Sequence, residues 1–98
     1  MHIKFAKTAI SQLQSIKSYI ARDNSERALE HIKKIIDGTK KILISPYIGK
    51  VNAVYNRDDI RETVIEGYKT IYQIKSPYII ILVIYKNIDF DESVMEIF

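Results

Sequence analysis

The sequence predicts a single α+β domain in which an N-terminal strand and a two-helix antiparallel hairpin precede a three-stranded antiparallel meander, giving one four-stranded sheet. A change in the spacing of apolar residues supports this. Apolar residues recur every three or four positions through most of the first half, which is typical of helices, and every second position from residue 60 onward, which is typical of strands. A chain of 98 residues suits one hydrophobic core, so we treat residues 1–98 as one domain.

The N-terminal region is predicted to be a strand followed by a helix. The segment HIKF, His2–Phe5, alternates and is rich in strand-forming residues. From Ala6 the apolar residues form one stripe along a helix that ends near Ala21. This stripe consists of Ala6, Ile10, Leu13, Ile16 and Ile20.

A second helix is predicted to follow after a very short turn. The segment DNSE places Asp23 three residues before Glu26, a spacing that resembles a capping box. The apolar pattern continues to about Ile44 in spite of Gly38, a residue that costs about 1 kcal/mol relative to alanine inside a helix. Pro46 then prevents continuation. Because the turn is short, we expect an antiparallel hairpin whose apolar stripes pack on each other or on a sheet.

The second half is predicted to be a long connection and three strands. Residues 45–59 contain the turn-forming residues of the connection, and strands follow at 60–66, 68–75 and 79–85. The last strand is apolar on both faces, so we expect it to be central and paired with the first strand. The final residues, 93–98, are also apolar, and we expect them to cover the sheet as a short strand or helix.

Composition excludes several classes of function. The chain has no cysteine and two histidines that form no recognisable metal set, and it has no glycine-rich phosphate loop or serine nucleophile motif, so no cofactor or metal is predicted. The N-terminus lacks the apolar run of a signal peptide, and the longest apolar run is too short to cross a bilayer. We therefore expect a cytoplasmic protein that does not enter membranes. A net charge of +3 favours an acidic partner only slightly.

The candidate site lies on the strands of the meander. Arg61 and Lys86 are expected to approach Lys69 on the open side of the sheet and form a small basic patch that binds a phosphate. Tyr85, beside Lys86, is a candidate proton donor or stacking platform for a base. The alternative is an ordinary solvated sheet face with a core tyrosine at the strand end, and composition alone favours that alternative.

Three segments together resemble the RelE/ParE family of toxins from bacterial type II toxin-antitoxin systems. They are AKTAISQLQSIKSYI, SPYIGK and IRETVIEGYKTIYQI followed by IIILVIYKN. The most specific part is an arginine–glutamate pair followed by a tyrosine, a basic residue, a second tyrosine and an aliphatic residue at fixed spacing. The chain meets this pattern with Arg61, Glu62, Tyr68, Lys69, Tyr72 and Ile74. The resemblance implies two helices packed on an antiparallel sheet.

The resemblance implies one of two activities. RelE-like members cleave messenger RNA on the ribosome, and the positions that match their basic and tyrosine residues are Arg61, Lys69, Tyr85 and Lys86. Under that hypothesis, Arg61→Ala and Lys86→Ala each abolish cleavage. ParE-like members inhibit DNA gyrase, and the same basic residues would then contact the target.

The RE pair, Arg61 and Glu62, and the SPYIGK segment are more similar to the ParE-like branch, and the sequence after the last strand weakens the nuclease hypothesis. Many family members have histidine, glycine and arginines there, whereas this chain reads YKNIDFDE, with the acidic residues Asp89, Asp91 and Glu92. These carboxylates repel a phosphate, although a role in capping or solubilising the tail is the simpler interpretation. A third possibility is a relative that has lost toxicity and only binds its partner.

Either branch implies a cognate antitoxin as the partner. A partly disordered antitoxin segment is expected to fold onto the apolar grooves and the sheet edge of the toxin. The exposed parts of the helical hairpin are the candidate surface, and the apolar tail at 93–98 is a candidate for displacement by the antitoxin.

Overall fold

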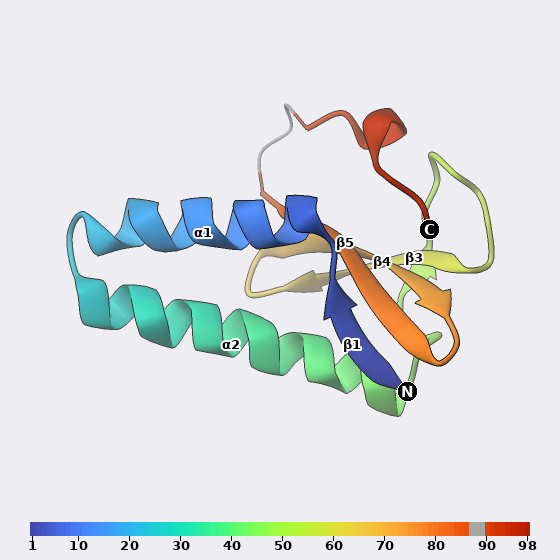
Figure 1. Ribbon diagram of the computed structural model, residues 1–98, viewed down its shortest axis with the longest axis horizontal. Helices are drawn as coiled ribbons and strands as arrows, with labels where there is room; N and C mark the ends of the chain where they lie inside the picture. Colours follow the sequence, from blue (N-terminus) through green and yellow to red (C-terminus); the bar gives the residue numbers. More distant parts are fainter. Residues whose placement is uncertain (87–89) are drawn as a thin grey trace.

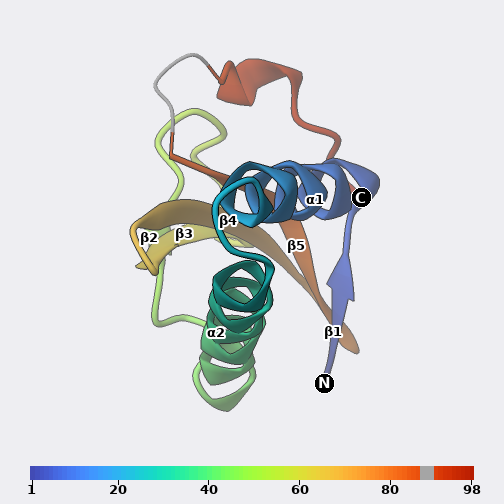
Figure 2. The same cartoon turned by 90° about the vertical axis from the view of Figure 1, so that its left-hand side faces the viewer.

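The computed structural model, which describes residues 1–86 and 90–98, has two helices on one face of a five-stranded mixed sheet (Figure 1). Strand order in the sheet is β1-β5-β4-β3-β2. The C-terminal segment and α2 lie on opposite sides of the sheet (Figure 2). The elements are β1 (His2–Phe5), α1 (Lys7–Ala21), α2 (Ser25–Ile44), β2 (Lys50–Val51), β3 (Ile60–Ile65), β4 (Tyr68–Lys75), β5 (Tyr78–Tyr85) and a 3-10 helix (Glu92–Val94).

Strand β5 occupies the central position that its apolar sequence predicts. It pairs in parallel with β1 and antiparallel with β4, and every residue from 79 to 84 is buried. The register with β4 shifts within this strand: Ile71 pairs with Val83, but the next residue, Tyr72, pairs with Ile81, so Leu82 is skipped. Leu82 and Val83 therefore both face away from the helices, whereas Ile81 faces them.

The sheet separates two hydrophobic cores. The helix-side core holds one stripe of each helix against the sheet, and its buried members are Ala9, Ile35, Ile42, Ile65, Tyr72, Ile79, Ile81 and Ile84. The second core lies on the opposite face and includes Met95 from the C-terminal segment. Its other buried members are Ala6, Ile60, Ile71, Ile80, Leu82 and Val83. The prediction that the apolar tail covers the sheet is thus confirmed, and the 3-10 helix is its only helical turn among the described residues.

Several boundaries differ from the sequence prediction. The sheet has a fifth strand, β2, which pairs over only two residues with β3 and is too short to give a periodic signal. The cap of α2 is Asn24, whose side chain accepts a hydrogen bond from the Arg27 amide, so the predicted Asp23 cap is wrong by one residue. Strand β3 ends at Ile65, because Glu66 and the glycine after it both have positive φ and form the turn.

Gly38 has a packing role within α2. A Cβ at this position would lie 2.4 Å from the Ile65 Cγ2 atom of β3, so only glycine lets the helix approach the strand this closely. The helix continues to Ile44 as predicted. The helix propensity lost at Gly38 is thus offset by close contact between helix and sheet.

The SPYIGK connection is fastened to the core by a buried tyrosine. The hydroxyl of Tyr72, on β4, donates to the Pro46 carbonyl at 2.7 Å and accepts from the Gly49 amide at 3.0 Å. A Cβ at Gly49 would lie 2.6 Å from the Glu62 carbonyl oxygen, so the connection passes directly over β3. This contact fixes the position of the loop that borders the candidate site.

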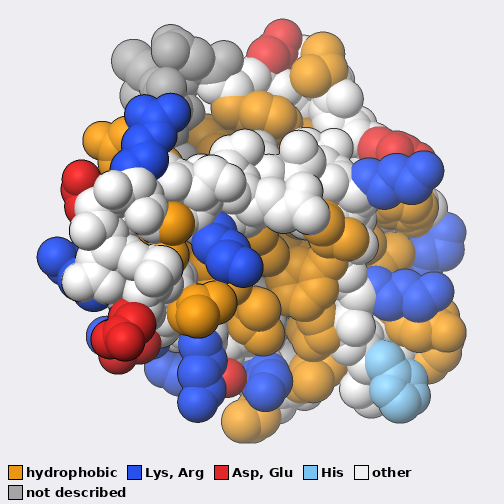
Figure 3. Space-filling view, turned by 60° about the vertical axis from the view of Figure 1, so that its left-hand side comes forward, with side chains coloured by type: hydrophobic (Ala, Val, Ile, Leu, Met, Phe, Trp, Pro, Cys, Tyr) orange, Lys and Arg blue, Asp and Glu red, His pale blue; other side chains and the backbone are white. Residues whose placement is uncertain are grey.

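Hydrophobic side chains gather in the middle of the face seen in Figure 3, with Lys and Arg side chains around them. An apolar groove of about 400 Å³ lies between the two helices and the end of β1. It is lined by Phe5, Ile10, Leu13, Gln14, Lys17, Ile32 and Ile36. Among the described residues, neither α1 nor α2 combines the length and apolar content that crossing a membrane requires.

Candidate functional site

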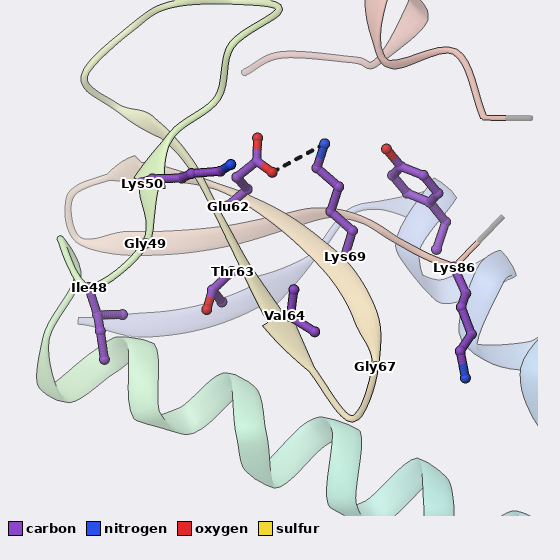
Figure 4. A pocket seen from close by; sticks show the side chains of 10 residues that line it. Ile48, Gly49, Lys50, Glu62, Thr63, Val64, Gly67, Lys69 and Lys86 are labelled. Atoms are coloured by element: carbon purple, nitrogen blue, oxygen red, sulfur yellow. Dashed lines mark ion pairs between the residues drawn. The ribbon is translucent and has the colours of Figure 1, made fainter. Parts of the chain in front are cut away.

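An open groove of about 780 Å³ runs along the meander and brings together three of the four predicted site residues (Figure 4). Lys69, Tyr85 and Lys86 line it, together with Lys50 of β2. Lys69 pairs across strands with both Val64 and Tyr85, so these three side chains form one row on the face opposite the helices. The remaining lining residues are Ile48, Gly49, Glu62, Thr63, Val64 and Gly67.

Lys69 is held between two carboxylates. Its ammonium lies 3.1 Å from Glu62 Oε2 and 2.5 Å from Glu92 Oε2, and both glutamate side chains are only 8% exposed. Burial by itself lowers the pKa of Lys69, but the hydrogen bonds and charges of Glu92 and Glu62 outweigh it and raise that pKa above its usual range. Lys69 therefore stays protonated, and the two carboxylates compensate its positive charge.

The carboxylate of Glu92 is the centre of this polar cluster. It accepts hydrogen bonds from Lys69, from the Asn52 amide at 2.9 Å and from the Tyr85 hydroxyl. Burial raises the pKa of Glu92, but these donors outweigh burial and hold the pKa below its ordinary value. Burial and the hydrogen bond to Glu92 together raise the pKa of Tyr85. Asn52 also donates to Glu62 at 3.1 Å, which completes the cluster.

Arg61 does not join Lys69, so the predicted patch is corrected on this point. Arg61 pairs with Tyr72 and shares the helix-side face of the sheet, whereas Lys69 is on the other face. Its guanidinium donates to the Gly49 carbonyl at 2.9 Å and to Asp58 at 2.6 Å, and it lies 4.7 Å from the ring of Tyr47. Arg61 therefore ties the connection to β3 beside the groove.

Lys86 lies at the opposite end of the groove from Lys50, and its side chain points away from Lys69 (Figure 4). Its ammonium lies 5.0 Å from the centre of the Tyr68 ring, where a cation is attracted to the π face. Tyr68 in turn contacts His31 of α2, with 3.2 Å between the hydroxyl and Nε2. Lys86 is exposed and is thus available to a ligand in the groove.

The groove is better suited to binding a partner than to catalysing proton transfer. A general acid is most effective with a pKa near the working pH, and the raised pKa of Tyr85 moves it further away. The carboxylates of Glu62 and Glu92 compensate the charge of Lys69, and their own negative charges repel a phosphate beside it. Among the described residues, no group of three or more histidine, cysteine, aspartate or glutamate side chains has the arrangement of a metal site.

Sequence reasoning missed Asn52, Glu62 and Glu92 as members of the site. Asp91 does cap the C-terminal 3-10 helix, as expected of the acidic cluster, because its carboxylate accepts from the Ser93 amide. Glu92 instead turns inward, and Asp89 lies outside the described residues. Only Glu62 carried a usable signal, because alternation along β3 places it on the same face as Val64 and hence Lys69.

Comparison with known proteins agrees with this architecture. A model of the family described as "ParE toxin of type II toxin-antitoxin system, parDE" matches residues 3–87. The chain belongs to the ParE toxin family of type II toxin-antitoxin systems. No curated protein matches it in sequence.

A solved structure supports the fold of this ParE-family toxin. The structure is titled "Chromosomal ParDE TA system from P. aeruginosa", and the similarity has a TM-score of 0.70 at 22% sequence identity. It covers 87% of this chain and 94% of that chain. The likeness confirms the predicted α+β arrangement, with the strand, two helices and meander in the predicted order.

Proposed function

We propose that this ParE-family toxin arrests growth in the bacterial cytoplasm by inhibiting DNA gyrase and that a cognate antitoxin neutralises it. The observation that carries the proposal is the ParE family match, which extends from residue 3 to residue 87 and so includes the helical hairpin and the whole meander. Gyrase inhibition is the activity that resemblance to the ParE-like branch implies.

The electrostatics of the groove support a protein target over RNA cleavage. An RNA-cleaving site has to stabilise a phosphate whose negative charge grows in the transition state, and this needs uncompensated cations. Here the central cation, Lys69, lies within 3.1 Å of two carboxylates. Such a surface matches the mixed charges of a protein partner better than a polyanion.

Three of the predicted site residues are proposed to act in target recognition. Lys86 is exposed at the rim of the groove and is the most direct contact. Lys69 acts within the groove, where its side chain is one-third exposed, at 34%. Arg61 acts from the neighbouring surface by holding Tyr47, whose ring is exposed, in place.

The antitoxin is proposed to bind the helical hairpin. The groove between the helices is almost entirely apolar, and Ile10 and Leu29 are respectively 45% and 58% exposed on the hairpin. An amphipathic segment that folds on binding buries such residues in a groove of this kind. Lys17 also lines this groove and suits an acidic residue of such a segment.

The direct test is supercoiling of relaxed plasmid by purified gyrase in the presence of the toxin. We expect wild-type toxin to reduce supercoiling and Lys86→Ala to need about tenfold more protein for the same effect, because one charged contact is lost. Lys33→Ala, which removes an exposed lysine of α2, is the matched control and should behave as wild type. Unchanged supercoiling together with cleavage of messenger RNA on translating ribosomes would contradict the proposal.

A further inference from the structure

Three donors from separate parts of the chain converge on the Glu92 carboxylate. Lys69 comes from β4, Tyr85 from the end of β5, and Asn52 from the residue after β2. Asn52 is fully buried, and Glu92 is 40 residues along the chain from Asn52, 23 from Lys69 and seven from Tyr85. The donors are thus held in place by the sheet, and the carboxylate is brought to them.

We infer that Asn52, Lys69 and Tyr85 form a carboxylate-binding site, which Glu92 fills in the free toxin and which an aspartate or glutamate side chain of a protein partner fills in its place. The site goes beyond gyrase inhibition, because it does not depend on which target the toxin has. It also differs from the apolar hairpin groove, since it lies on the opposite face of the sheet.

The charge of the site selects a carboxylate over a phosphate. Glu62 is fixed on β3, lies 3.1 Å from the Lys69 ammonium, and has a side chain that is only 8% exposed. Without Glu92 the site therefore holds one cation and one carboxylate and is close to neutral. A carboxylate adds one negative charge and so restores the charge that Glu92 gives the site. A phosphate adds more negative charge and bulk next to Glu62 in a region of low dielectric.

The C-terminal segment is attached in a way that permits exchange. The chain end is joined to β4 by the side chain of Gln73, which donates to the Phe98 carbonyl at 2.8 Å and accepts from the Phe98 amide at 2.9 Å. Tyr55 donates to the carbonyls of Ser93 and Met95. These hydrogen bonds come from side chains of the sheet and the connection, so departure of the segment breaks none of the backbone ladder, but it uncovers the part of the second core that Met95 covers. Lys69 would keep its pair with Glu62 and would not become an unpaired buried charge.

Rescue of Glu92→Ala by a small carboxylate tests the site in the full-length chain. The variant leaves the three donors around a vacant space, and acetate is the probe. We expect acetate to raise the melting temperature of Glu92→Ala by about 4–8 °C, with phosphate at matched ionic strength giving less than half of this shift. Wild type and Glu92→Ala/Lys69→Met are the controls and should not respond to acetate beyond the effect of ionic strength.

Two results would overturn the site. One is equal stabilisation of Glu92→Ala by phosphate and acetate, and the other is no stabilisation by either. If Glu92→Ala does not fold alone, the yield of refolding is measured in each anion. A higher yield in acetate than in phosphate then supports the site, and equal yields count against it.

Binding of a peptide tests the proposed protein ligand. The probe is the labelled peptide FDESVMEIF, which copies residues 90–98, and its twin has glutamine at the position equivalent to Glu92. We expect the acidic peptide to bind Glu92→Ala toxin at least about tenfold more tightly than the twin, since the twin lacks the charged hydrogen bonds. Equal affinity of the two peptides would refute the role of the carboxylate. Neither experiment uses gyrase, so each can fail while the supercoiling assay succeeds.

Discussion

Removing one hydroxyl, in Tyr72→Phe, should loosen the connection that borders the groove. Tyr72 is fully buried, and its hydroxyl binds both the Pro46 carbonyl and the Gly49 amide. Phenylalanine keeps the ring, so packing is retained and the change isolates the two hydrogen bonds. Leaving a buried donor and a buried acceptor without partners should lower the free energy of unfolding by about 2 kcal/mol. For a domain of this size that corresponds to a fall in melting temperature of about 8–16 °C.

Equilibrium urea denaturation followed by circular dichroism measures this effect. The midpoint should fall while the slope stays constant, because the surface exposed on unfolding is nearly the same. Tyr19→Phe is the control: Tyr19 is 72% exposed, and we expect a change within about 0.5 kcal/mol. Hydrogen exchange adds a local readout, since the Gly49 amide should exchange faster in Tyr72→Phe. A loss below about 0.5 kcal/mol would refute the reasoning that these hydrogen bonds hold the connection.

Three further predictions concern stability. Gly38→Ala should lower the melting temperature although alanine favours helices, because the added Cβ would lie 2.4 Å from the Ile65 Cγ2 atom. An increase in melting temperature would show that α2 moves away from β3 freely. Asn24→Ala should cost about 1 kcal/mol of unfolding free energy through loss of the α2 cap, and Asn24→Asp should restore it in urea titrations. The pKa of Glu92 is lowered in the folded chain, so its stabilisation is present above its ordinary value of 4.5 and is lost as pH falls through the lowered pKa. Glu92→Gln should therefore lose less stability than wild type between neutral and acidic pH, and identical pH profiles would count against the Lys69 pair.

The elements with strong periodic patterns were predictable from sequence. The first strand, both helices and the meander appear at nearly the predicted residues because apolar spacing decides which face each element buries. Strand β2 was not predictable, since two residues carry no period and its pairing with Arg61 and Glu62 depends on where the long connection returns. The move of the α2 cap from Asp23 to Asn24 reflects two neighbouring residues with similar capping chemistry.

The candidate site was predictable in part. Lys69, Tyr85 and Lys86 do line one groove, because the meander brings the ends of β4 and β5 together. The error over Arg61 is one of parity: a two-residue turn pairs Val64 with Lys69, and Arg61 is an odd number of positions from Val64, so it faces the other way. The sequence contained that information in its Glu-Gly turn. The position of Glu92 was beyond sequence reasoning, because it depends on how the C-terminal segment folds back over the sheet.

The most direct test of a gyrase-directed toxin is the order in which synthesis stops in cells. DNA and protein synthesis are pulse-labelled separately in the first minutes after the toxin is induced in bacteria without its antitoxin. We predict an early fall in DNA synthesis while protein synthesis continues. An early fall in protein synthesis with DNA synthesis intact would contradict the account and assign Lys69, Tyr85 and Lys86 to RNA cleavage instead.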